Sequence, residues 1–294
     1  MVESEARGRL PGIHPISVID IGSNSVRLVI YEGLSRAPAI LFNEKVLCGL
    51  GHRLAETGRM DDSAIARALA ALRRFKALSK QARAGALHVL ATAAAREASN
   101  GPEFVSRARD ILGTDIRVLT GEEEAGYSAR GVISGFHDPD GIVGDLGGGS
   151  FELVDIKGRQ MESGMTLPLG SLRLSEVSGN SVSQARTIAR RHLKSATLLG
   201  KGEGRLFYAV GGTWRNMAKL HMEMTDYPLH MMQGYQVPYP EVMDFLSYVA
   251  RMKETKDSAL RAVSRNRRAL LPFGAVVMQE ALAMMKPRAV SFSA

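Results

Sequence analysis

Two aspartates, Asp20 and Asp145, each end a run of mostly apolar residues and directly precede a short turn of small residues. Glycine permits positive φ and places no side chain before the amides, so successive N–H groups can converge on an anion. Both turns are therefore candidate phosphate-binding loops, although either one alone is also typical of a plain hairpin. The first turn comprises Gly22, Ser23, Asn24 and Ser25, and the second comprises Gly147, Gly148, Gly149 and Ser150.

The two aspartates need a cation if phosphate binds beside them, because an acid would otherwise repel the anion. Mg²⁺ takes oxygen ligands and is often held between carboxylates and phosphates. Asp20 and Asp145 are therefore candidate magnesium ligands. Glu152 lies two residues after Ser150 and could add a ligand, directly or through water. The alternative for Glu152 is a solvent-facing position on a strand.

Three consecutive glutamates, Glu122 to Glu124, follow Gly121 at the expected start of a helix. Acidic residues in a first helical turn interact favourably with the helix dipole, which accounts for two of them. We expect the third to point into a cleft and activate water, an effect worth roughly 10²–10⁴ in rate. Arg96, in the segment ATAAARE, is a candidate phosphate clamp, with a surface arginine as the alternative.

A third small-residue segment, Gly211, Gly212 and Thr213, follows the apolar strand expected at Leu206–Val210. A strand, two glycines and a helix start can receive a phosphate, and can also be a tight turn. The next residue, Trp214, could stack on a base, although packing in the core is the favoured interpretation. Further basic residues could guide a long polyanion or form a solvated face: Arg190, Arg191, Lys194, Arg265, Arg267 and Arg268.

An internal repeat relates the first two turns. The segment Val18–Ile30 (VIDIGSNSVRLVI) aligns with Val143–Asp155 (VGDLGGGSFELVD) at a fixed offset, 143 − 18 = 125. Each copy reads as a strand, then Asp-x-Gly-x-x-Ser, then a second strand. Two duplicated halves that face each other would place both turns across one cleft.

The remaining pattern predicts alternating strands and helices, hence an α/β protein with two domains. We expect a flexible arm at residues 1–15, a first domain at 16–138, and a second at 139–294, with a linker near Phe136–Asp140. The expected strands are Ser17–Ile21, Val26–Tyr31, Ala39–Lys45, Ala86–Ala91, Ile116–Leu119, Gly141–Asp145, Phe151–Ile156, Leu206–Val210 and Arg288–Phe292. The expected helices start at Asp61 or Asp62, at Asn100, and at Thr213, and cover Glu122–Ser134, Ser183–Leu199, Glu241–Met252, Ser258–Val263 and Pro272–Met285.

The net charge and composition indicate which classes of molecule the protein is expected to bind. The 294 residues carry 38 basic and 30 acidic side chains, a formal charge of 38 − 30 = +8, which favours polyanionic partners. No recognised nucleic-acid-binding motif accompanies this charge, so nucleic acid is not the expected partner. The single cysteine, Cys48, is expected to be a small buried residue in a cytoplasmic protein. No signal peptide or membrane span is expected from the apolar pattern.

Five segments together resemble the Ppx/GppA phosphatase family: VIDIGSNSVRLVIYEG from Val18, ATAAARE from Ala91, TGEEEAGYSARGV from Thr120, GDLGGGSFELV from Gly144 and AVGGTWR from Ala209. They occur in the family's order and spacing. The resemblance runs from about Ile16 to the C-terminus. Sugar kinases and chaperone ATPases share the turns but lack the Gly-Glu-Glu-Ala signature between them.

The resemblance implies two actin-like, ribonuclease-H-like domains with a cleft between them. It also implies removal of the terminal phosphate of inorganic polyphosphate or guanosine pentaphosphate (pppGpp), with Mg²⁺. The family's catalytic glutamate maps to Glu124, and its magnesium-associated acids map to Asp145 and Glu152. Its phosphate loops map to the two turns, and its phosphate-contacting arginine maps to Arg96. A homodimer is the family's implied assembly.

The resemblance also carries one departure and two alternatives. Family members usually continue beyond RAVSFSA with a Gly-x-Arg-Glu-Gly turn and a helix, and longer members add a helical part. We therefore expect a second domain without its closing helix, with weakened stability, activity and grip on long chains. The alternative functions are a kinase or ATPase of the same superfold, and a polyphosphate or pppGpp sensor without turnover.

Overall fold

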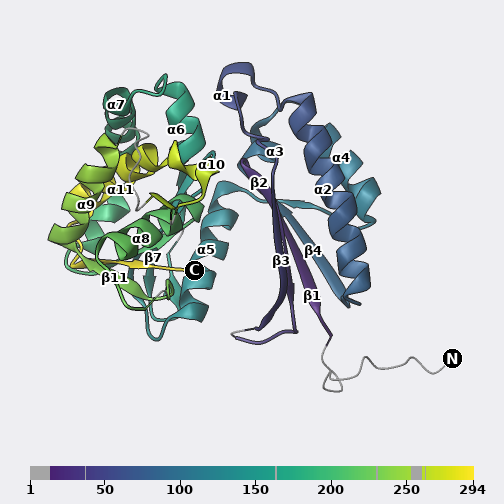
Figure 1. The fold of residues 1–294 in the computed structure, drawn as a ribbon, viewed down its shortest axis with the longest axis horizontal. Helices are drawn as coiled ribbons and strands as arrows, with labels where there is room; N and C mark the ends of the chain where they lie inside the picture. The colour runs from purple at the N-terminus through teal and green to yellow at the C-terminus, as the bar shows by residue number, and fades with distance from the viewer. Residues whose placement is uncertain (1–13, 37, 163, 230, 253–259, 262) are drawn as a thin grey trace.

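Two β-sheets lie side by side with helices around them in the computed structural model (Figure 1), which describes residues 14–294 except 37, 163, 230, 253–259 and 262. At the centre of the first sheet, β1 pairs antiparallel with β2 and parallel with β4. The spatial order is β3 (Ile40–Leu47), β2 (Ser25–Tyr31), β1 (Ile16–Ile21), β4 (Ala86–Ala91) and β5 (Arg117–Val118).

The second sheet repeats this arrangement around β6. Here β6 pairs antiparallel with β7 and parallel with β10, as β1 pairs with β2 and β4. The matching topology confirms the predicted actin-like α/β fold with two related sheets. The order is β11 (Tyr235–Pro238), β12 (Ala289–Phe292), β10 (Leu206–Val210), β6 (Asp140–Leu146), β7 (Phe151–Lys157) and β8 (Gln160–Met161), and β9 (Met165–Leu167) also pairs with β7.

The first half has its hydrophobic core between its sheet and two helices, α2 (Asp62–Gln81) and α4 (Gly101–Leu112). The Asp61 side chain accepts hydrogen bonds from the amides of Ser63 and Ala64, so this residue caps α2 as expected. Gly113 ends α4 with φ 70°, a conformation that costs glycine little. Two short helices, α1 (Leu54–Thr57) and α3 (Ala93–Glu97), complete this half.

The second half buries both faces of its sheet. Strands β6 and β7 are buried on both faces, because helices cover each side. The larger core includes α7 (Val182–Leu193), α8 (Gly212–Met224), α9 (Tyr239–Arg251) and α11 (Leu271–Met285).

Helix α5 (Gly121–Gly135) packs on the opposite face of the second sheet. Its buried residues Ala125, Ala129 and Val132 contact a cluster that includes Val143 and Val154. The helix lies between the two halves (Figure 1), although it precedes the boundary expected after residue 138. That domain boundary stays a prediction.

The predicted elements differ from the structure mainly in short segments. The predicted helix Ser183–Leu199 is wrong in its last six residues, because α7 ends at Leu193 and a 3₁₀ helix then covers Thr197–Gly202. The strand predicted at Ile116–Leu119 is shorter in the structure, where β5 covers only Arg117–Val118. Seven short elements were not predicted from the sequence: α1, α3, α6 (Ser171–Val177), α10 (Arg265–Arg268), β8, β9 and β11. Most of the predicted arm, and half of the predicted helix Ser258–Val263, lie outside the described residues.

Two further expectations concern Cys48 and the membrane. Cys48 is a free cysteine, 1 % exposed, as expected for a small core residue. Within the described ranges, the helices are too short or too polar to cross a bilayer.

Candidate functional site

A pocket of about 200 Å³ lies where the two halves meet, and both predicted turns line it. Asp20, Glu124, Asp145, Gly211 and Gly212 also line this pocket. A larger hollow of about 490 Å³, next to Ile16 and Gly85, lacks such a cluster of charges and is not the candidate site. The structure therefore brings together most of the residues that the sequence singles out.

The two turns have the same backbone geometry and contact each other. In the first, the Gly22 amide donates to the Ser25 carbonyl at 3.0 Å, and in the second Gly147 donates to Ser150 at the same distance. A Cβ atom added to Gly148 would lie 3.3 Å from the Ser23 Cβ atom. The internal repeat is therefore a structural duplication, and its two copies face one another across the pocket.

Amides from neighbouring segments hold the carbonyl groups of both turns. The Ser23 carbonyl accepts from Gly51 at 2.7 Å. The carbonyls of Gly147 and Gly148 accept from the first amides of α6, at 3.0–3.1 Å. No described peptide bond is cis, and in a trans peptide the N–H points opposite to the C=O. The amides of Asn24, Gly148 and Gly149 therefore point away from these partners, which leaves them to meet an anion.

The two predicted metal acids occupy equivalent places in the two sheets. Asp20 on β1 lies opposite Arg27 on β2, and Asp145 on β6 lies opposite Glu152 on β7. Burial, together with the nearby Asp145 charge, raises the pKa of Asp20 to about 6. Burial also raises the pKa of Asp145, although the Ser128 hydroxyl donates a hydrogen bond to it. Solvent still reaches the Asp20 side chain through the pocket.

The three glutamates of α5 separate into different roles. Glu122 is exposed, and Glu123 forms a reciprocal capping box with Thr120. Glu124 is the one that reaches the pocket. Burial raises its pKa to about 7, against the opposing effect of Arg96, whose Nη1 donates to Glu124 Oε2 at 3.1 Å. A carboxylate with this pKa is suited to accept a proton near neutral pH.

Two of the predicted residues lie behind the pocket wall. Arg96 donates to Glu124 and, at 2.7 Å, to the Leu119 carbonyl, and it is not among the residues that line the pocket. Glu152 is 1 % exposed and accepts from the Thr166 hydroxyl at 2.8 Å, which rules out the solvent-facing alternative. Burial and the charges of Glu124 and Asp145 raise the Glu152 pKa well above its usual value. The phosphate and metal roles assigned to these two residues stay predictions.

Four cationic side chains line the same pocket: Arg27, Lys45, Arg215 and Arg267. Lys45 lies opposite Arg27 on the neighbouring strand. Burial and the three arginines lower the Lys45 pKa to about 8. Among the described residues, none of the four forms an ion pair with an acid within 4.0 Å. Because these positive charges repel one another, a bound anion would lower the electrostatic energy of the pocket.

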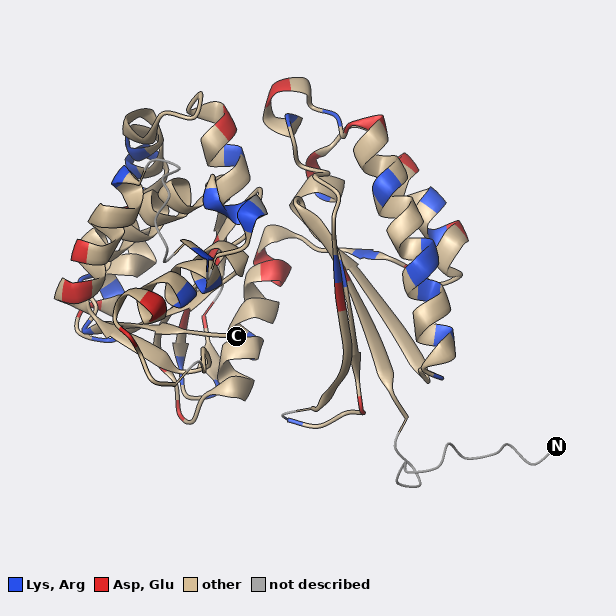
Figure 2. Cartoon of the chain, viewed as in Figure 1, with Lys and Arg blue, Asp and Glu red and all other residues tan. Residues whose placement is uncertain are grey.

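Only one of these four cations was a sequence candidate. Arg267 belongs to the proposed basic face, and α10, which carries it, lies beside the first half (Figure 2). Another member of that face, Arg190, instead pairs with Glu280 at 2.7 Å. Arg27 could have been found, because 27 + 125 = 152 makes it the repeat partner of Glu152. Arg215 ends the AVGGTWR segment but was not singled out, and Lys45 gave no sequence signal, because strand pairing brings it to the pocket.

The third glycine segment forms the wall next to Asp145. Gly211 has φ 106°, and a Cβ atom there would lie 2.4 Å from the Leu146 carbonyl oxygen. Thr213 is fully buried and contacts the Ser171 hydroxyl at 3.0 Å, so it supports the wall without lining it. Trp214 is also fully buried and donates to the Gly274 carbonyl at 2.9 Å. The core interpretation of this tryptophan is confirmed.

The carboxylates fit a hydrated divalent cation better than a cage built from protein alone. The described residues contain no group of three or more His, Cys, Asp and Glu side chains arranged to hold a metal. Asp20 and Asp145 supply two oxygen donors from opposite sides of the pocket. Mg²⁺ is commonly bound by one or two carboxylates, with water and phosphate oxygens as its other ligands. The two carboxylates of Asp20 and Asp145 match this type of magnesium site.

Comparisons with known proteins agree with this geometry. The sequence profile of the Ppx/GppA phosphatase family matches residues 18–294. Exopolyphosphatase 2 of Mycobacterium tuberculosis is 29% identical over 293 residues, covering 93% of this chain and 92% of that protein. The crystal structure of an exopolyphosphatase-like protein has a TM-score of 0.85 at 26% identity, covering 95% of this chain and 94% of that one. The Aquifex aeolicus member of the Ppx/GppA family has a TM-score of 0.78 at 25% identity, covering 96% and 94%.

Proposed function

This chain belongs to the Ppx/GppA phosphatase family, and from that premise we propose that it releases the terminal phosphate of inorganic polyphosphate with the help of Mg²⁺. One observation carries the proposal. Two matched turns face each other across a pocket that Glu124 also lines. The name of the relative exopolyphosphatase 2 supports polyphosphate as the substrate class.

Phosphate binding rests on two sets of groups. The amides of the two turns offer hydrogen bonds to the oxygens of the terminal phosphates. The unpaired cations Arg27, Lys45, Arg215 and Arg267 neutralise the charge of the chain. Such preorganised groups supply most of the acceleration in phosphoryl transfer, because little covalent chemistry is left to the protein.

Asp20 and Asp145 would hold the magnesium ion, with Glu152 behind them as an indirect or water-mediated partner. When bound, Mg²⁺ would neutralise charge on the phosphate oxygens during bond cleavage. Ser128 fixes one oxygen of Asp145 by donating to it, and so keeps this carboxylate oriented.

Glu124 orients a water molecule and accepts its proton as the oxygen of the water attacks the terminal phosphorus. The bond from that phosphorus to the bridging oxygen breaks, and the shortened chain leaves with the electron pair. Arg96 keeps the Glu124 carboxylate in place, because it donates to it from a fixed position against the Leu119 carbonyl. The raised pKa of Glu124, about 7, makes it a stronger base than an exposed glutamate.

We propose polyphosphate as the preferred substrate over pppGpp. The 5′ end of pppGpp offers the same terminal phosphate, so the same chemistry applies to it. However, the described residues that line the pocket include no aromatic side chain. Phe151 and Trp214, each two residues after a pocket glycine, are both fully buried and unavailable to a guanine.

The test is phosphate release from polyphosphate and from pppGpp side by side, each with Mg²⁺ and with EDTA. We expect release from both, a higher kcat/KM for polyphosphate, and loss of activity in EDTA. ADP formation that requires a second substrate would instead favour a kinase, and tight binding without release would favour a sensor.

A further inference from the structure

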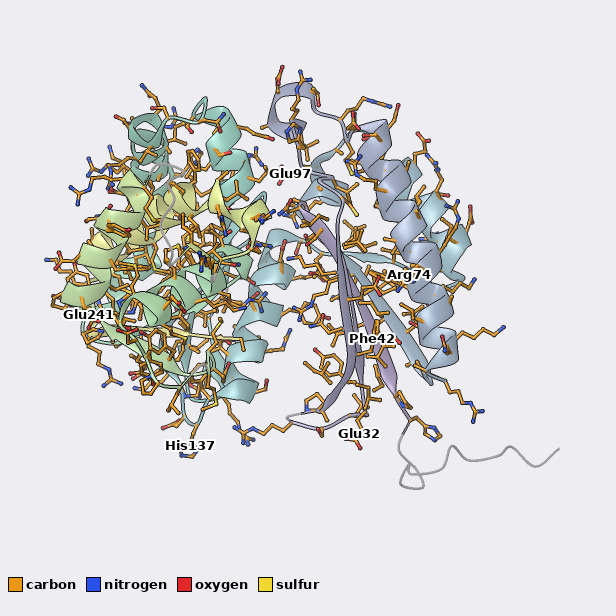
Figure 3. The ribbon with its side chains drawn as sticks, in the orientation of Figure 1. Glu32, Phe42, Arg74, Glu97, His137 and Glu241 are labelled. Carbon is orange, nitrogen blue, oxygen red and sulfur yellow. The ribbon has the colours of Figure 1, made fainter. Side chains whose placement is uncertain are left out.

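A chain of alternating charges connects the two halves beside the pocket. Arg173 on α6 donates from Nη1 to Glu97 Oε2 at 2.6 Å. Glu97 is the last residue of α3 in the other half, and its second oxygen lies 3.9 Å from Arg96 Nη2. Arg96 in turn holds Glu124 at 3.1 Å. Figure 3 shows Glu97 on the side of the first half that faces the second half.

Each end of this chain is fixed to one part of the site. The Arg173 amide donates to the Gly148 carbonyl at 3.0 Å, so Arg173 moves with the second phosphate turn. This close approach needs Gly170, because a Cβ atom there would lie 2.4 Å from Gly148 backbone atoms. At the other end, Glu124 is the proposed base. Because α5 packs on the second sheet, both the Arg173–Glu97 contact and the Arg96–Glu124 contact pass between the first half and the second.

Glu97 is a competitor for Arg96. It is next to Arg96 in sequence and already lies within 4 Å of its guanidinium. The ion pair between Arg173 and Glu97, at 2.6 Å, is shorter than the contact between Arg96 and Glu97, at 3.9 Å. Without Arg173, a free carboxylate would stand beside Arg96, and opposite charges at this distance attract strongly in a partly buried setting. Arg96 would then divide its hydrogen bonds between Glu97 and Glu124.

We propose that Arg173 is a positioning residue. By forming an ion pair with Glu97, it leaves Arg96 free to donate its hydrogen bond to Glu124 when the two halves are together. Assembly of the second phosphate turn against the first half then also orients the water-activating carboxylate. Neither Arg173 nor Glu97 lines the pocket, so both act through Arg96. The inference rests on the proposed function, because it assigns Glu124 the role of base.

The test is a set of variants assayed for phosphate release from polyphosphate with Mg²⁺. Arg173→Ala should lower kcat about tenfold and change KM less than twofold, because substrate-binding groups stay intact. Adding Glu97→Gln to that variant removes the competitor and should restore kcat to within about threefold of wild type. Arg173→Lys should also retain most of the activity, since it still provides a cation for Glu97.

If the Arg173–Glu97 ion pair only holds the two halves together, the variants should behave differently, and that result would overturn the proposal. In that case Glu97→Gln alone would be as slow as Arg173→Ala, and the double variant would recover nothing. The control is Lys201→Ala, which breaks the Lys201–Glu162 ion pair of the same 2.6 Å length within one half and should leave release unchanged.

A crystal structure of Arg173→Ala separates this proposal from the proposed function. We expect Arg96 to turn toward Glu97 and to lengthen its 3.1 Å contact with Glu124. An unmoved Arg96 would overturn the positioning role even if the wild-type protein hydrolyses polyphosphate. A wild-type protein that releases no phosphate would refute the proposed function. The position of Arg96 in the variant would still show whether Arg173 positions it.

Discussion

Replacing Asp20 by asparagine should stabilise the protein in the absence of metal. Burial and the Asp145 charge raise the Asp20 pKa from 3.8 to about 6, so the ionised form is disfavoured in the folded state. That shift corresponds to about 3 kcal/mol. Because solvent reaches the Asp20 side chain through the pocket, screening reduces the effect to about 1–2 kcal/mol. The attraction of Arg27, Lys45 and Arg215 is already included in the shift.

The effect has a defined dependence on pH. Below the pKa of the unfolded chain, Asp20 is protonated in both states and costs nothing. As the pH rises, the unfolded chain loses its proton first, so the folded state loses relative stability until the pH passes about 6. At pH 8 in EDTA, Asp20→Asn should therefore melt roughly 2–8 °C above wild type. At pH 4.5, which is still above the unfolded pKa of 3.8, the difference should shrink to about a third of its value at pH 8.

The assay is thermal denaturation in EDTA and in Mg²⁺, with Asp110→Asn as the control. Asp110 is exposed on α4, so its replacement should change little at either pH. Mg²⁺ should raise the melting temperature of wild type more than that of Asp20→Asn, because the ion binds the folded state through this carboxylate. An Asp20→Asn protein that melts at or below wild type at pH 8 in EDTA, or a gap at pH 4.5 as large as that at pH 8, would refute the reasoning.

Three further predictions concern activity and stability. The pH profile of kcat/KM should rise through about 7, as Glu124 ionises, and fall above about 8, as Lys45 loses its charge; Lys45→Arg should remove the alkaline fall. Arg215→Ala should raise KM for polyphosphate about tenfold with a smaller change in kcat, measured by steady-state phosphate release. Gly211→Ala should lower the free energy of unfolding by about 1–3 kcal/mol in urea denaturation, and more than Gly204→Ala, whose added Cβ atom meets nothing within 4 Å.

The sequence predicted the parts of the site that depend on local backbone chemistry. Both glycine turns are specified by residues within a few positions of one another, and the repeat indicated that they would face each other. The choice of Glu124 among three glutamates also agrees with the geometry, because the Thr120–Glu123 capping box sets the rotation of the helix start. The long elements α2, α4 and α11 were recognisable from caps and periodicity.

The remaining features depend on contacts that no local pattern encodes. Lys45 reaches the pocket through the pairing of β3 with β2, and Arg215 through the packing of α8. No pattern in the sequence indicated that α5 packs on the second sheet instead of the first. Short elements such as α3 and α6 have too few residues for a periodic signal, and tertiary contacts hold them. The Arg173–Glu97 contact joins two of these unpredicted helices.

The most direct measurement of the central claim compares Glu124→Gln with wild type, for both polyphosphate binding and phosphate release, in Mg²⁺ near pH 8. We predict binding within about threefold of wild type, because the turns and cations remain, and phosphate release at least about 100-fold slower. Phosphate release at the wild-type rate would contradict the assignment of Glu124 as the base.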